Sequence, residues 1–120
     1  MKYDIFMKTD KYKIYFLHIL EAIEKLELVA STTTKEEFLN DWLKQDAVLK
    51  NFIVIGEAIS QIDEEIKLKF PDTDWRGAKS MRNFIVHEYF SVDNSFVWET
   101  IFETIPTFKI QMENILKELE

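Results

Sequence analysis

Residues 46–62 read DAVLKNFIVIGEAISQI, and this stretch decides the fold. Apolar side chains fall on nearly every side of a helix drawn through it, whereas a surface helix keeps one solvated face. Such a helix must be covered on several sides, so we expect it at the centre of the protein. In so small a chain a second copy could supply part of the cover, which predicts a homodimer. Gly56 permits close approach of a neighbouring helix, at a cost of about 1 kcal/mol relative to alanine.

An amphipathic helix and a capping signal precede the central stretch. Apolar residues recur at helical intervals over residues 11–28 with charges between them, which predicts a helix there. Thr34 and Glu37 have the spacing of a capping box, in which two side chains satisfy free backbone N–H groups at a helix start. We expect a second helix to begin there and to run through Trp42.

Polar clusters after the central stretch mark three more helix starts. Asp63 can cap a short helical turn, and a longer helix should begin near Trp75. A polar break at residues 91–95 separates that helix from a final one over residues 96–116, which Pro106 is expected to kink. The candidate capping residues are Asp63, Asp72, Thr73, Asp74, Asp93, Asn94 and Ser95.

The composition agrees with a bundle of helices. At 120 residues and 14.4 kDa the chain fits one domain, which we place at residues 1–120. Two glycines and two prolines leave little turn material for a many-stranded sheet. We therefore expect an all-α protein, an antiparallel bundle of about five helices with short connections.

Several chemical classes are excluded by what the sequence lacks. Without cysteine there are no disulfides, thiolate metal sites or cysteine nucleophiles, and a reducing cytoplasm is the expected location. Residues 1–6 carry an early acid and no long apolar run, so we expect neither a signal peptide nor a membrane span. No glycine-rich phosphate loop or nucleophile elbow is present, which argues against the usual kinds of nucleotide hydrolysis.

The acidic charge balance limits contact with nucleic acid. A net charge of −7 disfavours broad electrostatic binding, because the phosphate backbone attracts clusters of Lys and Arg. Any contact with RNA must be local, and one suggestive patch contains Arg76, Lys79 and Arg82. The alternative is a helix that carries ordinary surface cations.

Residues 81–89 read MRNFIVHEY and contain the candidate chemistry. Arg82 can bind phosphate oxygens through its fork of N–H groups, and a histidine such as His87 is the type of side chain that most often carries protons in catalysis, so the segment suits chemistry on a phosphodiester. On an ideal helix these two residues lie about 140° apart and about 7.5 Å along the axis, whereas Asn83 and His87 share a face. The candidate site is therefore the edge of a groove. The alternative is a structural histidine and an arginine paired with a glutamate.

Two polar residues elsewhere have weaker cases. Glu57 lies on the apolar central stretch and is either a buried group with a function or part of a solvated edge. His18 has no second histidine or Glu-x-x-His partner, so we expect no metal site there.

With these residues in view, the chain resembles the HepT family of HEPN-domain ribonuclease toxins, the partners of minimal nucleotidyltransferase (MntA) antitoxins. The resemblance spans nearly the whole chain. It rests on Asp46-Ala47-Val48 with Asn51, Ile55-Gly56-Glu57-Ala58, Pro71, Trp75-Arg76, Met81-Arg82-Asn83, Val86-His87-Glu88-Tyr89-Phe90, Val92-Asp93, Val97-Trp98 and Pro106.

This resemblance implies a metal-independent endoribonuclease without a cofactor, acting as a homodimer whose two Arg-x4-His segments line one cleft. His87 would take the proton from a ribose 2′-hydroxyl or give one to the leaving 5′-oxygen, while Arg82 would neutralise charge on the phosphate. Asn83 would orient His87 or bind phosphate. Possible cleft or RNA contacts are Arg76, Lys79 and Glu57.

The resemblance also implies a role for Tyr89, as the acceptor to which the nucleotidyltransferase antitoxin transfers AMP in a type VII-like toxin–antitoxin pair. A bulky anion two residues from His87 would fill the cleft and compete for Arg82. Two other functions stay open. One is a non-catalytic HEPN subunit that binds nucleotide or substrate for a companion nucleotidyltransferase, and the other is a purely structural helical dimer.

Overall fold

Every regular element between residues 2 and 120 is a helix; this is the part of the chain that the computed structural model describes, with side chains from residue 12 onward. In chain order the elements are α1 (Lys2–Thr32), α2 (Lys35–Leu39), α3 (Trp42–Ser60), α4 (Glu64–Lys69), α5 (Trp75–His87), the 3₁₀ helix η1 (Tyr89–Ser91), α6 (Asn94–Glu103) and α7 (Ile105–Leu119). The all-α prediction is confirmed. About five helices were expected, and the described residues form more because α2, α4 and η1 are short additional turns.

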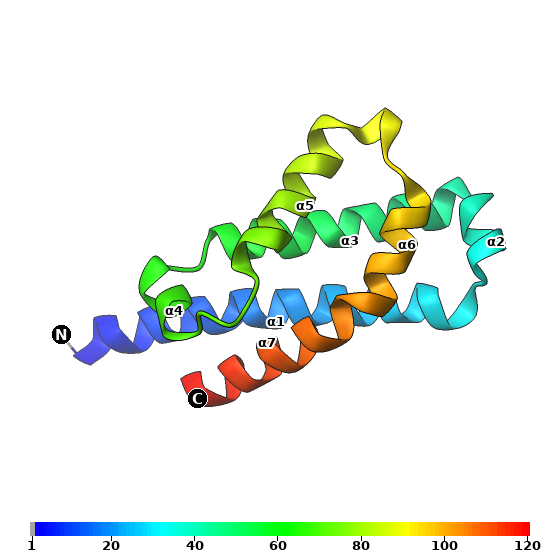
Figure 1. The fold of residues 1–120 in the computed structure, drawn as a ribbon. Helices are drawn as coiled ribbons and strands as arrows, with labels where there is room; N and C mark the ends of the chain where they lie inside the picture. The colour runs from blue at the N-terminus through cyan, green and yellow to red at the C-terminus, as the bar shows by residue number, and fades with distance from the viewer. Residues whose placement is uncertain (1) are drawn as a thin grey trace.

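Two long helices, α1 and α3, form the body of the protein, and the other helices pack around them (Figure 1). α3 returns antiparallel to α1, α7 lies along the other side of α1, and α5 packs on α3. α6 leads the chain from the far end of α5 back to α7. The fully buried side chains between these helices are Phe16, Ile19, Ile23, Leu26, Phe38, Val48, Ile59, Ile85, Val97, Met112 and Ile115.

The apolar central helix α3 is covered largely from within its own chain. α1 packs against one side and α5 against another, which leaves Ile53 and Val54 half-buried and Ala47 exposed. The sequence led us to expect part of this cover from a second copy. α5 supplies much of this cover, and the cover of the half-buried remainder by a second copy stays a prediction.

α5 approaches α3 closely at Gly56. A Cβ added to Gly56 would lie 2.8 Å from Cγ of Arg82, nearer still to its Cβ, and 3.1 Å from the carbonyl oxygen of Ala78. Glycine is therefore required for the observed helix spacing, as the sequence predicted. The same contact fixes where Arg82 leaves α5.

The capping residues define most helix boundaries. The Thr34 hydroxyl accepts a hydrogen bond from the Glu37 backbone N–H at 3.2 Å, which confirms the predicted start of α2. We expected that helix to run through Trp42, but α2 ends at Leu39 and Trp42 begins α3. The cause is Asp41, whose carboxylate accepts from two backbone N–H groups in the first turn of α3.

Pro106 begins a helix and does not kink one. α6 ends at Glu103, and α7 begins at Ile105 with Pro106 in its first turn. The missing N–H of proline costs nothing there, because the first N–H groups of a helix have no partner within it. The expected single helix over residues 96–116 is therefore two helices.

The N-terminal expectation concerned residues 1–6, whose side chains lie outside the described part of the chain. Among the described residues, no helix combines the length and the apolar character needed to cross a bilayer.

Candidate functional site

The candidate residues lie along α5 and the turn that follows it. Asp74 caps α5 by accepting from the Gly77 backbone N–H at 2.9 Å, and the helix ends at His87, with η1 directly after it. Ile85 is fully buried against the core, so it sets which side of α5 faces α3. The other candidate residues of α5 therefore face directions that are set relative to Ile85.

Arg82 forms an ion pair with Glu57 of α3. Its Nη1 donates to Glu57 Oε1, and the arginine side chain is 17% exposed while the glutamate side chain is 55% exposed. Glu57 is therefore at the solvated edge of α3, and it holds the arginine at the junction of the two helices. Arg82 Nε is buried and has no hydrogen-bond partner.

His87 and Asn83 lie on a different side of α5 from Arg82. Both side chains are exposed, and among residues 12–120 Arg82 makes no hydrogen bond to either of them. This agrees with the angle of about 140° between positions 82 and 87 on an ideal helix. One chain therefore presents the arginine and the histidine on adjacent faces of α5, without closing a site around a substrate.

The two further cations of α5 share the side of His87. Arg76 and Lys79 are exposed, and on an ideal helix they fall with Asn83 and His87 inside an arc of about 80°. We call Arg76, Lys79, Asn83 and His87 the polar stripe. It extends for about 16 Å along the helix axis. The local basic patch expected from the sequence is thus divided, since Arg82 turns away to Glu57.

Tyr89 of η1 is hydrogen-bonded to α3. Its hydroxyl donates to Asp46 Oδ1 at 2.6 Å, and the ring is 45% exposed. This hydrogen bond to a carboxylate is the main cause that raises the pKa of Tyr89, because it stabilises the neutral phenol. Sequence reasoning named Asp46 only among the residues of the resemblance and did not pair it with Tyr89, which follows it by 43 residues. Only the antiparallel pairing of α3 with α5 brings them together.

Large apolar side chains are exposed around the same segment. Phe90 is 99% exposed, and its ring contacts that of Tyr89 edge to face at 5.3 Å between centroids. Phe84, Val86 and Phe96 are also exposed, at 41%, 53% and 54%. We call Phe84, Val86, Phe90 and Phe96 the apolar rim.

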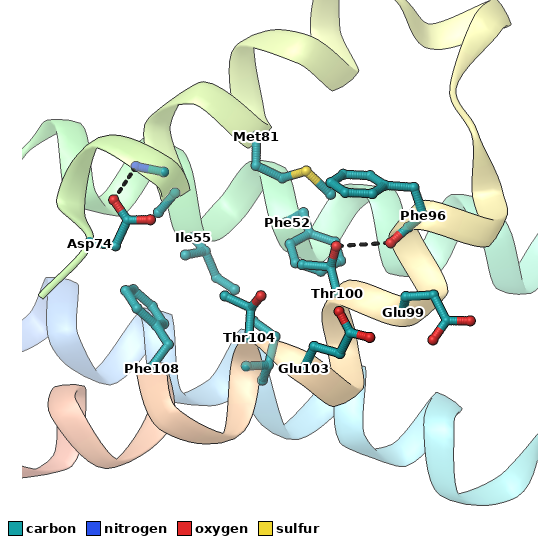
Figure 2. Close-up of a pocket in the computed structure, with 13 residues that line it drawn as sticks. Phe52, Ile55, Asp74, Met81, Phe96, Glu99, Thr100, Glu103, Thr104 and Phe108 are labelled. Carbon is teal, nitrogen blue, oxygen red and sulfur yellow. Dashed lines mark hydrogen bonds between the residues drawn. The ribbon is translucent and has the colours of Figure 1, made fainter.

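A pocket of about 280 Å³ lies on the other side of α5, among α3, α5, α6 and α7 (Figure 2). Met81 extends toward Phe96 across its upper edge, and the charged side chains that line it are Asp74, Glu99 and Glu103. Anionic walls disfavour a phosphate ligand. This pocket is therefore not the site for chemistry on RNA.

The second histidine, His18, is exposed on α1. Within the described part of the chain, no group of three or more histidine, aspartate or glutamate side chains is arranged to hold a metal ion.

The comparisons with known proteins converge on one family. The family model described as "Ribonuclease HepT-like" matches residues 19–115, which include all of α3 and α5. No solved structure gave a significant match.

Curated relatives are similar over most of this chain. A protein of Thermococcus cleftensis named "Probable ribonuclease HepT" is 37% identical over 106 residues, which cover 88% of this chain and 96% of the relative. A candidate RNase of Caldanaerobacter subterraneus subsp. tengcongensis is 32% identical over 112 residues, 93% of this chain and 98% of the relative. A Methanocaldococcus jannaschii protein, named as a gamma-glutamylcyclotransferase and candidate RNase, is 35% identical over 108 residues, and the matched part spans 49% of its length.

Proposed function

The chain belongs to the HepT-like ribonuclease family, and from this premise we propose that it is a metal-independent endoribonuclease of the cytoplasm that acts as a homodimer. One observation carries the proposal. An exposed histidine ends α5 little more than one turn after an arginine whose guanidinium is held at the junction of α3 and α5 by a carboxylate from α3. Proton transfer and charge neutralisation are the two needs of phosphodiester cleavage by the adjacent 2′-hydroxyl.

His87 is the proton carrier in this mechanism. As a base it takes the 2′-hydroxyl proton, the 2′-oxygen attacks phosphorus, and an acid then protonates the departing 5′-oxygen. Arg82 binds the non-bridging oxygens, where negative charge accumulates. To do so its guanidinium exchanges Glu57 for phosphate through its terminal N–H groups.

A second copy of the chain completes the site. One histidine cannot act as base and acid in the same event, and each chain presents one His87. The exposed apolar side chains of the rim, near His87 in sequence, support pairing through this region, since exposed apolar surface is characteristic of an interface. Two α5 segments brought together across a twofold axis would place Arg82 of one chain nearer to His87 of the other. A mixed dimer with one His87→Ala chain that cleaves as fast as the wild type would contradict this arrangement.

The polar stripe provides a path for the RNA backbone. Arg76 and Lys79 lie two to three turns before His87 on the same side of α5, so they can neutralise phosphates flanking the cleaved bond. Asn83, one turn before His87, orients the imidazole or binds phosphate. The local character of the stripe reconciles RNA binding with a net charge of −7.

The partner is a nucleotidyltransferase antitoxin that transfers AMP to Tyr89, as in type VII-like toxin–antitoxin pairs. Exposure of the Tyr89 ring supports this role, because the acceptor hydroxyl must enter the active site of another protein. The added phosphodiester anion would lie two residues from His87, where it repels substrate phosphate and competes for Arg82.

A non-catalytic subunit that binds nucleotide or substrate is the second candidate. The Arg82–Glu57 ion pair favours it, since an arginine already neutralised by a carboxylate is a weaker phosphate ligand. RNA cleavage by the purified chain in excess chelator separates the two functions. We expect cleavage by the wild type, loss in His87→Ala and wild-type rates in His18→Ala, a matched control at the other histidine. A wild-type chain that binds RNA and does not cut it would support the binding subunit.

A further inference from the structure

We propose that Asp46 is the general base for the modification of Tyr89, accepting the phenol proton as the tyrosine oxygen attacks the α-phosphorus of a nucleoside triphosphate held by the partner. The inference rests on the proposed function, in which Tyr89 is the acceptor. It adds a catalytic residue that this chain itself supplies to the reaction.

The Asp46 carboxylate already accepts a hydrogen bond from the hydroxyl whose proton the reaction must remove. The distance from Tyr89 Oη to Asp46 Oδ1 is 2.6 Å, within the range of a hydrogen bond between a hydroxyl and a carboxylate. Asp46 lies in the second turn of α3, which is fixed in the core through Val48 and Leu49. The carboxylate is therefore held in place, while Tyr89 lies on the short η1 helix and is 45% exposed.

The chemistry requires such a base. The hydrogen bond to Asp46 raises the pKa of Tyr89, so the phenolate is not formed in advance and the proton must leave during attack. The Oη–Pα bond forms, the bond from Pα to the pyrophosphate oxygen breaks, and pyrophosphate leaves with that electron pair. The phenol proton passes to the Asp46 carboxylate and from there to water. The nucleoside triphosphate is the co-reactant, supplied by the nucleotidyltransferase.

After transfer, the modified Tyr89 side chain cannot keep its position beside Asp46. A modified Tyr89 has no hydroxyl proton to donate, and its phosphodiester anion would face the Asp46 carboxylate after that group has lost its proton. Repulsion between the two charges drives the modified side chain away from α3. Asp46 thus serves both the transfer and the displacement that follows it.

A second tyrosine–aspartate pair in the chain provides an internal control. Tyr12 donates to Asp63 at 3.0 Å, and this pair is partly buried, at the end of the molecule that carries α4. Tyr89 is the better acceptor of the two because its hydroxyl is paired with a carboxylate and its side chain is exposed, whereas Tyr12 is half-buried. If proximity to a carboxylate were sufficient, both tyrosines would be modified.

The test measures transfer of labelled AMP by a purified MntA-type nucleotidyltransferase with ATP and Mg²⁺, onto unmodified wild type, Asp46→Asn, Asp63→Asn and Tyr89→Phe. The amide in Asp46→Asn would retain an oxygen that can orient the hydroxyl, but it cannot take the proton. We expect kcat for Asp46→Asn to fall about 10²- to 10⁴-fold with KM unchanged, as for loss of a general base. Asp63→Asn should be modified at the wild-type rate, and ribonuclease activity of Asp46→Asn should persist.

Each outcome of this experiment either supports or overturns the role of Asp46. Wild-type kcat in Asp46→Asn, or a loss that appears only in KM, overturns the base role. If Asp46→Asn folds poorly, Asp46→Ala replaces it, and formate is added as a small carboxylate that can act in place of the missing side chain. A saturable increase in the rate of AMP transfer with formate, absent in the wild type, supports the role of Asp46 as the base. A flat response to formate refutes it. No labelling of the wild type, or equal labelling of Tyr89→Phe, overturns the modification itself, which is a separate failure from that of Asp46.

Discussion

Gly56→Ala tests the close crossing of α3 and α5 on which the site depends. The new methyl group would meet Cβ and Cγ of Arg82 and the Ala78 carbonyl oxygen, the latter two at 2.8 and 3.1 Å. The Arg82 Cβ is fixed to the α5 backbone, so rotation of a side chain cannot relieve the contact. α5 would have to retreat by about 1 Å to restore ordinary van der Waals separation.

Two opposing contributions determine the size of the effect. Overpacking costs about 1–3 kcal/mol, and we take the upper part of that range, about 2–3 kcal/mol, because the nearest atom is a Cβ that cannot rotate away; the better helix propensity of alanine returns about 1 kcal/mol. We therefore expect the free energy of unfolding to fall by about 1–2 kcal/mol, which corresponds to a decrease in Tm of about 3–10 °C for a domain of this size. RNA cleavage should fall as well, since Arg82 moves with α5.

Urea denaturation monitored by circular dichroism measures the loss, and Gly77→Ala is the matched control. The three atoms nearest to a Cβ at Gly77 would belong to the carboxylate of Asp74, the end of a side chain that can rotate away by giving up its capping hydrogen bond. Some capping energy would be lost and helix propensity gained, so we expect a change within about 1 kcal/mol. A Gly56→Ala protein as stable and as active as the wild type would refute the close crossing.

Three other changes have defined outcomes. Phe38→Ala removes a fully buried ring and should lower the free energy of unfolding by about 3–5 kcal/mol in urea denaturation. Glu57→Gln removes the charge that competes with phosphate for Arg82, so RNA affinity measured by fluorescence anisotropy should rise several-fold. The free energy of unfolding should change by less than about 1 kcal/mol, because the glutamate side chain is 55% exposed. The hydrogen bond to Glu27 raises the pKa of Lys109 in the folded protein. The Lys109–Glu27 interaction therefore stabilises the fold fully at pH values below 10.5, the ordinary lysine pKa, and this contribution is lost as the pH rises through the higher pKa of the folded state. Glu27→Gln should therefore destabilise the protein at pH 8 and lose that effect in strong alkali.

Separate results would contradict these expectations. Leu39→Ala, at a neighbouring and 40% exposed position, is the control for Phe38→Ala, and an equal loss in both variants would mean that burial is not the cause. Weaker RNA binding by Glu57→Gln would show that the glutamate positions Arg82 for phosphate. A destabilisation by Glu27→Gln that persists unchanged in strong alkali would contradict the linkage to Lys109.

Local signals in the sequence predicted local structure well. The Thr34–Glu37 capping box and the caps at Asp63, Asp74 and Asp93 lie where the helices begin, because a cap needs only residues within one turn. Pro106 was assigned to a kink because proline interrupts a helix and also begins one, and the pattern around it fits both.

Contacts between distant residues were not predictable in the same way. The pairs Tyr89–Asp46 and Arg82–Glu57 join residues 43 and 25 positions apart, and they depend on how α5 lies against α3. Gly56 indicated that a helix would come close, but nothing in its neighbourhood specified which helix or which register. The division of the basic patch, with Arg82 turned toward α3 and Arg76 on the polar stripe, follows from that register.

The rate of RNA cleavage by the purified chain in excess chelator, wild type beside His87→Ala, tests the central claim most directly. The proposed chemistry predicts chelator-resistant cleavage that falls by at least about 10²- to 10⁴-fold in the variant, since the substitution removes the proton carrier from both chains of the dimer. A His87→Ala protein that cleaves at the wild-type rate, or a wild type inactive until a metal ion is restored, would contradict it.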